Sequence, residues 1–342
     1  MTISLDATYS IGGELSGVGL YSREILLGLA AAYPETRFEF CLRSHRYLRS
    51  WAESYPPNVR RRLLAEPLGP RSSALFHGLN QRLPRIPLRR AVVTFHDLFV
   101  LTGAYSTAEF RARFAQQARD AAARASAFIA VSAFTKSQMV SLLGVDPAKV
   151  HVVHHGVRAL SFPSLDREKT VLSVGAIQAR KNTARLVAAF ESLDATWKLV
   201  IAGSAGYGSE DILARIEASP ARSRIFVTGY VTTADLAAHY ARASIFAFPS
   251  LDEGFGMPVL EAMAAGTPVV TSNRSALPET AGDAAILIDP ESVEALGDAL
   301  RNLAQNPDLR KEMERKGRER AGLFTWEKAV RETWNAYRSV LD

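Results

Sequence analysis

Short apolar segments alternate with amphipathic segments over most of the 342 residues of this chain. Each apolar segment is rich in valine, isoleucine, phenylalanine or alanine, which is typical of strands buried on both faces. The segments between them carry apolar residues at helical spacing. This alternation predicts an α/β fold in which parallel sheets are covered by helices. The expected strands are residues 3–7, 37–43, 74–78, 91–97, 127–132, 149–154, 170–175, 198–203, 224–229, 245–250, 267–272 and 285–289.

The scheme occurs twice, and the length of the chain suits two domains that each bury a core. The regular pattern lapses at residues 159–169, where polar residues collect. We therefore expect two doubly wound domains, the first over residues 1–160 and the second over residues 161–324.

A largely helical tail follows the last expected strand. Its final segment, residues 325–342, carries Trp326, Val330, Trp334 and Tyr337 at helical spacing. We interpret this stripe as core packing and expect the helix to pack back on the first domain.

The charge of the chain is uneven. Residues 1–160 have a formal net charge of +9 and residues 161–342 of −3. The excess of arginine in the first part has two interpretations: a solvated face, or a surface that meets phosphates or an anionic membrane leaflet. Nucleic acid is not the expected partner, because no basic motif with interleaved aromatic residues is present. The arginines that account for much of the excess are Arg60, Arg61, Arg62, Arg82, Arg85, Arg89 and Arg90.

Three observations indicate the cellular compartment. No apolar run reaches the ~18 residues that a membrane span needs, and the first ten residues read as a strand rather than a secretory signal. The single cysteine, Cys41, lies in an apolar run and is interpreted as a buried thiol. We expect a cytoplasmic protein, either free or peripheral at the inner face of the cytoplasmic membrane.

In open parallel sheets, ligands bind beyond the carboxyl ends of the strands. Two candidate positions in the first domain lie at such ends. The first is the segment between the first strand and the first helix, which contains Gly17, Val18 and Gly19. It either lets the backbone approach an anion closely or is a plain turn, and the sequence leaves both interpretations possible. His96 directly follows a strand, where it either donates a hydrogen bond to a ligand or bonds nearby backbone.

A third candidate is the segment VGAIQARKN, residues 174–182, between a strand and the helix expected from Thr183. Arg180 and Lys181 bring two cations to the free amides of a helix start, which makes a diphosphate clamp. A surface pair is the alternative, but cations at a helix N-terminus oppose its dipole. That local penalty favours an anionic ligand.

The fourth candidate is EGFGMPVLE, residues 253–261, which spans a strand-to-helix loop and the first turn of a helix. Met257 stands at the expected N-cap and cannot cap, so the amides of Gly254, Phe255, Gly256 and Met257 are left for a ligand. Glu253 and Glu261 can each accept two hydrogen bonds from a diol. Two diols and a central anion describe a nucleoside diphosphate sugar, and we expect both carboxylates to be buried rather than solvated.

The motifs in the second half of the chain resemble those of a known family. EGFGMPVLE, with FPS before it and AMAAGTPVV after it, closely resembles the two-glutamate motif of retaining glycosyltransferases of sequence family 4. VGAIQARKN is similar to the phosphate-binding segment of the family, and FVTGYV to its base-binding strand end. Bacterial mannosyltransferases of surface polysaccharide assembly are the nearest likeness. The resemblance implies the GT-B fold: two Rossmann-like domains facing across a cleft, with the acceptor on the first and the nucleotide sugar on the second.

The resemblance also implies roles for single residues. Glu253 would bind hydroxyls of the donor sugar and Glu261 the ribose, while Gly254, Phe255, Gly256 and Met257 would hold sugar and phosphate through their amides. Arg180 and Lys181 would neutralise the diphosphate, and His96 would hold the sugar near its reacting carbon. Gly17, Val18 and Gly19 would close over the diphosphate, and Tyr230 and Val231 would border the base. Ala176 stands where many relatives carry an arginine, so one phosphate contact is in doubt.

The implied reaction is transfer of a hexose to a hydroxyl with retention of configuration. By likeness the donor is GDP-mannose, with UDP- and dTDP-sugars as alternatives, and the acceptor is a saccharide or a lipid-linked saccharide. No Asp-x-Asp, His-Glu-x-x-His or paired Cys-x-x-Cys motif occurs, so neither a metal site nor another cofactor is expected. A sugar phosphorylase and a non-catalytic subunit that binds nucleotide sugars stay open. A dehydrogenase lacks the full glycine fingerprint.

Overall fold

The structure is a computed structural model that describes residues 1–13, 15–65, 69–70 and 72–342. The chain forms two compact units, which are described separately. The first comprises residues 1–102, 107–156 and 324–342, and the second residues 103–106 and 157–323. The chain thus passes from one unit to the other at residues 156/157, four residues before the expected boundary.

The first unit contains a seven-stranded parallel sheet of order β3-β2-β1-β4-β5-β6-β7. Six of its strands are at the positions predicted from the apolar segments, and β3 is an additional strand at the edge. The strands are β1 (Thr2–Asp6), β2 (Arg37–Leu42), β3 (Val59–Leu63), β4 (Leu75–Gly78), β5 (Ala91–Phe95), β6 (Ala127–Ala130) and β7 (Val150–Val152).

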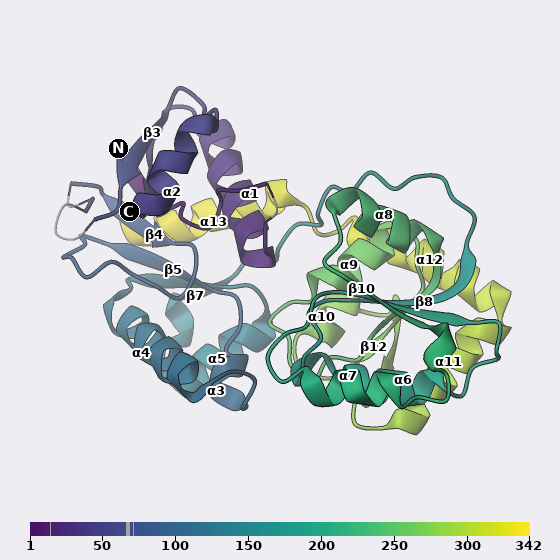
Figure 1. The fold of residues 1–342 in the computed structure, drawn as a ribbon. Coiled ribbons are helices and arrows are strands. Elements are labelled where there is room, and N and C mark those ends of the chain that lie inside the picture. The colour runs from purple at the N-terminus through teal and green to yellow at the C-terminus, as the bar shows by residue number, and fades with distance from the viewer. Residues whose placement is uncertain (14, 66–68, 71) are drawn as a thin grey trace. The chain divides into compact units, whose positions relative to one another are not determined.

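Helices cover both faces of this sheet (Figure 1). One core lies under α1 and α13 and contains Ile25, Val330 and Tyr337, and the other lies under α4 and contains Phe114. The helices of this unit are α1 (Gly17–Ala32), α2 (Ser44–Arg49), α3 (Phe99–Thr102), α4 (Ala108–Arg124), α5 (Ala133–Leu143) and α13 (Trp326–Leu341), with 3₁₀ turns η1 (Ser50–Ala52) and η2 (Pro147–Lys149).

The second unit contains a six-stranded parallel sheet of order β10-β9-β8-β11-β12-β13. All six strands were predicted from the sequence. In both sheets the first strand of the unit lies in the interior, and the order reverses beside it, between β1 and β4 and between β8 and β11. The strands are β8 (Glu168–Val174), β9 (Lys198–Ala202), β10 (Ile225–Gly229), β11 (Ala243–Phe248), β12 (Val269–Ser272) and β13 (Ala285–Ile288).

Figure 1 shows α8, α9 and α12 on one face of this sheet and α6, α7 and α11 on the other. Covering both faces buries the central strands β11 and β12 almost entirely, which explains why they read as continuous apolar runs, whereas the edge strand β10 is largely exposed. The helices are α6 (Thr183–Phe190), α7 (Glu210–Glu217), α8 (Thr233–Arg242), α9 (Met257–Ala264), α10 (Leu277–Ala281), α11 (Val293–Gln305) and α12 (Pro307–Ala321), with 3₁₀ turns η3 (Ala179–Lys181) and η4 (Arg222–Arg224).

The side chain before a helix fixes where several of these helices begin. Ser16 accepts a hydrogen bond from the Gly19 amide at the start of α1, and Ser292 and Thr325 do the same for α11 and α13. Such caps satisfy amides that otherwise have no partner in the helix. By contrast, α6 and α9 follow Asn182 and Gly256, both with positive φ, and neither residue caps its helix with a side chain.

Candidate active site

Two loops meet where the strand order of the second sheet reverses. One follows β8 and contains η3, and the other follows β11 and leads into α9. The backbone amide of Leu251 in the second loop donates to the carbonyl of Arg180 in the first. The reversal point of an open parallel sheet is where ligands of such folds bind. The candidate site of the second unit is therefore built from residues about 72 positions apart in the chain.

Arg180 and Lys181 both contact the carboxylate of Glu253. The distances to Glu253 Oε1 are 2.8 Å from Arg180 Nη1 and 2.6 Å from Lys181 Nζ. Arg180 and Glu253 are buried, and Lys181 Nζ also lies 4.6 Å from the ring centroid of Phe248. The cluster thus brings two cations to one buried carboxylate at the edge of the sheet.

The Glu253 carboxylate keeps its charge despite burial. Burial by itself raises the pKa of this group, but the ammonium of Lys181 and the guanidinium of Arg180 outweigh that effect and lower the pKa to about 2. A permanently ionised carboxylate accepts hydrogen bonds only. Glu253 can thus hold the two cations in place and accept hydrogen bonds from ligand hydroxyls with its remaining capacity.

The loop between Glu253 and α9 is fixed by bonds to its own carbonyls. Thr280 donates to the carbonyl of Phe255, and the Ala276 amide to the carbonyl of Glu253. In the described part of the chain the amides of Gly256 and Met257 donate to no group. Free amides beside a helix start attract anions.

The structure corrects one detail of this loop. The N-cap of α9 is Gly256, with φ of 100°, and the helix begins at Met257 rather than at Pro258. The predicted consequence is unchanged, because glycine has no side chain with which to cap. Gly256 is required here, since a Cβ atom would lie 2.7 Å from Leu277 Cδ2.

Glu261 occupies a different environment one helical turn along α9. Its Oε2 accepts a hydrogen bond from the Tyr240 hydroxyl at 2.9 Å, and its Oε1 lies 3.4 Å from Arg158 Nε. Burial raises the pKa of this carboxyl, and Arg158 and Tyr240 oppose that effect only in part. Tyr240 and Arg158 were not predicted as site residues. Tyr240 reads as an ordinary core aromatic on α8, and Arg158 lies within the expected first domain, directly before the break expected at residues 159–169.

Comparison with known proteins agrees with this geometry. Residues 161–320 match the family described as "Glycosyl transferases group 1", and residues 40–159 match "Glycosyltransferase Family 4". The chain is 28% identical over 375 residues to O-antigen chain mannosyltransferase B of Escherichia coli, covering 97% of this chain and 98% of that relative. This chain is a family 4 glycosyltransferase of the GT-B fold.

Solved structures support the fold of this glycosyltransferase. Sucrose-phosphate synthase from Thermosynechococcus elongatus superposes with a TM-score of 0.78 at 21% identity, covering 99% of this chain and 98% of that one. Anabaena HepE, solved in complex with UDP and glucose, superposes with a TM-score of 0.73 at 16% identity, covering 99% of each chain. At these identities the likeness concerns the architecture alone.

The other residues predicted for the second unit lie at a strand end. Tyr230 and Val231 directly follow β10, and the Tyr230 side chain is 64% exposed. In this glycosyltransferase they stand beyond the carboxyl end of the sheet, on the same edge as the Glu253 cluster. Their predicted role at the base of the donor stays a prediction.

In the first unit, His96 follows β5 and its Nε2 lies 2.9 Å from the carbonyl oxygen of Leu79. Its ring stacks on His155 with a centroid distance of 5.4 Å. Burial lowers the pKa of His96 to about 4, so the ring is neutral at physiological pH. The contact with the Leu79 carbonyl matches the second of the two interpretations of His96, a histidine that bonds nearby backbone. A neutral ring still has its other nitrogen, Nδ1, for a ligand.

Gly17, Val18 and Gly19 form the first turn of α1 rather than a loop before it. Gly19 has a packing reason to be glycine, because a Cβ atom there would lie 2.8 Å from the carbonyl oxygen of Tyr9. The Val18 carbonyl accepts a hydrogen bond from Ser22 Oγ. Their predicted closing over the diphosphate is a relation between units and stays a prediction.

No group of three metal-ligating side chains is positioned to hold an ion in the ranges that the structure describes. Over the same residues, no helix has the length and apolar character of a membrane span. The arrangement in the second unit suits a polyhydroxylated anion: cations and amides for the phosphates, and one buried carboxylate on either side for hydroxyls.

Proposed function

We propose that this glycosyltransferase is a retaining, metal-independent mannosyltransferase that transfers mannose from GDP-mannose to a hydroxyl of a saccharide or lipid-linked saccharide. The observation that carries the proposal is the cluster of Arg180 and Lys181 on the buried carboxylate of Glu253. Similarity over nearly the whole chain to a mannosyltransferase supports the choice of sugar.

In the proposed reaction the bond from the anomeric carbon of the donor to the diphosphate oxygen breaks, and a bond to the acceptor oxygen forms on the same face. The acceptor proton passes to the departing phosphate oxygen. Arg180, Lys181 and the N-termini of α6 and α9 stabilise the charge that builds on the diphosphate. Glu253 holds the two cations and binds sugar hydroxyls, and Glu261 binds the ribose.

Donor specificity is tested by thermal shift with GDP-mannose, UDP-glucose, dTDP-glucose and ADP-glucose, because a tight ligand raises stability by a few kcal/mol at saturation. We expect the largest rise in Tm with GDP-mannose. A matched pair of variants identifies the site: Glu261→Gln should abolish most of the rise, while Glu312→Gln on the exposed side of α12 should leave it intact. A larger rise in Tm with a UDP- or dTDP-sugar would contradict GDP-mannose as the donor and identify that sugar nucleotide instead.

Catalysis is tested by incubation with the donor and a mannose-containing acceptor, with the anomeric configuration of the product read by NMR. We expect retention, with full activity in a chelator. Release of a sugar phosphate from a disaccharide and orthophosphate would make the protein a phosphorylase. Donor binding without hydrolysis or transfer to any acceptor would make it a non-catalytic subunit.

We also propose that the first unit contacts an anionic membrane surface, where a lipid-linked acceptor would reside. Leu48 and Trp51 are 74% and 64% exposed, and Arg49 between them is exposed as well. Exposed apolar side chains beside a cation suit a lipid interface. Co-sedimentation with phosphatidylglycerol vesicles should fall when Leu48 and Trp51 are both replaced by serine. Equal sedimentation of the variant would contradict this contact.

A further inference from the structure

In the described part of the chain, Arg158 is the only cation paired with the buried carboxylate of Glu261. Its Nε lies 3.4 Å from Glu261 Oε1, and its side chain is 19% exposed, against 6% for that of Glu261. The guanidinium has no further ion-pair or hydrogen-bond partner among the same residues. Arg158 belongs to the segment that opens the second unit, before β8, and Glu261 lies on α9. The tertiary structure therefore gives each of the two charges to the other.

The contact between Arg158 and Glu261 leaves the carboxylate able to bind a ligand. A separation of 3.4 Å is longer than the ~2.7–2.9 Å of a charge-assisted hydrogen bond, so Arg158 acts through its charge. The Tyr240 hydroxyl uses one position on Oε2, at 2.9 Å. A carboxylate has about four lone-pair positions, and most of those of Glu261 are therefore still available to hydroxyl groups of a ligand.

The charge of Glu261 decides whether it can accept those hydrogen bonds. An ionised carboxyl group accepts with both oxygens, whereas a protonated one carries a hydrogen on one of them. Burial raises the pKa of Glu261, and the charge of Arg158 opposes this rise more strongly than the hydrogen bond from Tyr240 does. Burial also raises the pKa of the Tyr240 hydroxyl, which therefore keeps its proton and donates it. Among the described residues these two groups are the titratable ones that act on Glu261.

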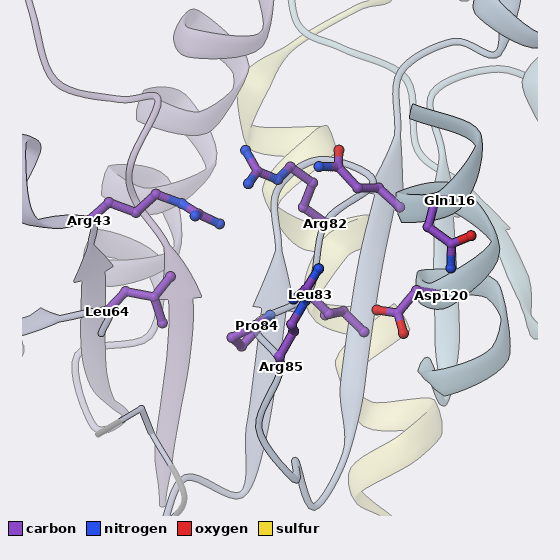
Figure 2. A pocket seen from close by; sticks show the side chains of 9 residues that line it. Arg43, Leu64, Arg82, Leu83, Pro84, Arg85, Gln116 and Asp120 are labelled. Atoms are coloured by element: carbon purple, nitrogen blue, oxygen red, sulfur yellow. The ribbon is translucent and has the colours of Figure 1, made fainter. Parts of the chain in front are cut away.

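An exposed ion pair of the first unit shows why burial matters. Figure 2 shows Asp120 beside a pocket that Arg43 also lines. The Asp120 side chain is 41% exposed, and its Oδ2 lies 2.8 Å from Arg124 Nη1. Water also supports the charge of such a carboxylate, so the loss of an exposed partner has a small effect. Water is largely excluded at Glu261, and its charge therefore depends on the guanidinium of Arg158.

We propose that Arg158 is a positioning residue for the donor: it keeps the Glu261 carboxylate charged at neutral pH, so that both carboxylate oxygens accept hydrogen bonds from the ribose hydroxyls of the nucleotide sugar. Arg158 itself does not contact the donor and acts through Glu261. The inference rests on the proposed function, which assigns the ribose to Glu261. It predicts that replacement of Arg158 makes donor affinity dependent on pH, in a way that simple damage to the fold would not.

The first test measures the charge state of Glu261 in the protein without a donor. Glutamate labelled with carbon-13 at the side-chain carboxyl is titrated by NMR, and the Glu261 signal is assigned by its loss in Glu261→Gln. Arg158→Met keeps an apolar side chain and should raise the pH midpoint of this signal by about one unit or more. Arg158→Lys should keep the midpoint close to that of the natural protein, because the contact supplies charge rather than a hydrogen bond.

The second test measures donor affinity by calorimetry at the two ends of a pH series, with the sugar nucleotide that stabilises the protein most. Near pH 5, Arg158→Met should weaken binding by about fivefold or more, since a pKa shift of one unit changes the ionised fraction up to tenfold. Near pH 8, where Glu261 is ionised in both proteins, the difference should largely disappear. Arg242→Met is the control, because Arg242 is an exposed arginine that lies 3.9 Å from Glu168, and it should change affinity at neither pH.

The other outcomes also decide, once circular dichroism has established that each variant is folded. A loss of affinity that is equal at all pH values, or that Arg158→Lys does not restore, would overturn the proposal in favour of a structural role or a direct contact with the donor. An unchanged NMR midpoint in Arg158→Met would overturn it as well. If no sugar nucleotide binds, the proposed function fails, while the titration without donor still decides whether Arg158 sets the charge of Glu261. The two failures are therefore distinguishable.

Discussion

Glu253 and Glu261 are the same residue type eight positions apart, yet their carboxyl groups have opposite pKa shifts. Two cations within 3 Å lower the pKa of Glu253 to about 2. Burial raises the pKa of Glu261, whose nearest partners are the Tyr240 hydroxyl and the more distant Arg158. The carboxyl group of Glu253 thus stays ionised even in acid, whereas that of Glu261 is protonated more easily than an ordinary glutamate.

Replacement of Glu253 should make the free energy of unfolding less dependent on pH in the acid range. Because its folded pKa is below its unfolded value of about 4.5, its contribution is present above pH 4.5 and is lost as pH falls toward 2. Glu253→Gln removes the buried carboxylate that pairs with Arg180 and Lys181 and should lower the free energy of unfolding at pH 7 by about 3–5 kcal/mol. The deficit should shrink between pH 5 and 3 in urea unfolding curves. A deficit that is constant over this range would contradict the assignment.

Lys181→Ala separates catalysis from folding. Glu253 keeps Arg180 as its partner in this variant, so the fold should persist. If Lys181 stabilises the departing diphosphate, turnover should fall about 10²–10³-fold. Lys198→Ala, which removes an exposed lysine at the start of β9, is the control for charge and should have normal turnover. Near-normal turnover of the Lys181 variant would exclude this role.

At the scale of the elements, the two helix starts at the site lack a side-chain cap, as do those of α2, α7 and α10, whereas several other helices have one. Ser16, Ser292 and Thr325 cap their helices with hydroxyl oxygens. Asn182 instead directs its amide to the carbonyls of Pro249 and Pro290, and Gly256 has no side chain to offer. The second unit therefore leaves helix amides uncapped at the edge where the ligand is expected, which is consistent with anion binding there.

Gly256→Ala tests the geometry of the α9 start. The substitution places a Cβ at φ of 100° and 2.7 Å from Leu277 Cδ2, so strain and overpacking add. We expect a loss of about 2–4 kcal/mol in the free energy of unfolding and weaker donor binding. Gly322→Ala is the matched control, because Gly322 has φ of −62° and only ordinary contacts. It should change stability by less than about 1 kcal/mol.

The elements themselves were largely predictable. Twelve strands were expected and all twelve are present, because a strand that helices cover on both faces consists mostly of consecutive apolar residues. The strand that was missed, β3, is VRRRL at the edge of the first sheet. Among the described residues this strand pairs with β2 alone. Arg62 pairs with Glu39, and Arg61 donates to the carbonyls of Ser50 and Glu53. Those tertiary contacts leave no signal in the local sequence.

At the scale of the whole molecule, the end of the chain completes the first unit. Val330, Ala336 and Tyr337 of α13 are buried in the core under α1. The Tyr337 hydroxyl lies 2.6 Å from Nδ1 of His77, a buried residue 260 positions earlier in the chain. The apolar stripe of this helix predicted that it would pack on a surface, and the structure places it in the unit of residues 1–102 and 107–156.

Tyr337→Phe should weaken the first unit selectively. It leaves His77 Nδ1 buried without its partner, which we expect to lower stability by about 1–3 kcal/mol. Amide hydrogen exchange should speed up in β4 and α13 and stay unchanged in β8–β13. Tyr207→Phe, at a tyrosine that is 51% exposed in the second unit, is the control and should leave both patterns unaltered. Uniform acceleration across both units would contradict a local role.

The sequence by itself determined the strands, the two-sheet architecture and the short segments that line the ligand edge, because burial and helix starts are local patterns of residue type. Only the tertiary structure decided which side chains meet: Arg180 and Lys181 with Glu253, Tyr240 and Arg158 with Glu261, and Arg43 with the wall of a cavity. The physical reason is that parallel strands bring together loops that are distant in the chain, and the charge state of a buried group depends on those neighbours rather than on its own sequence.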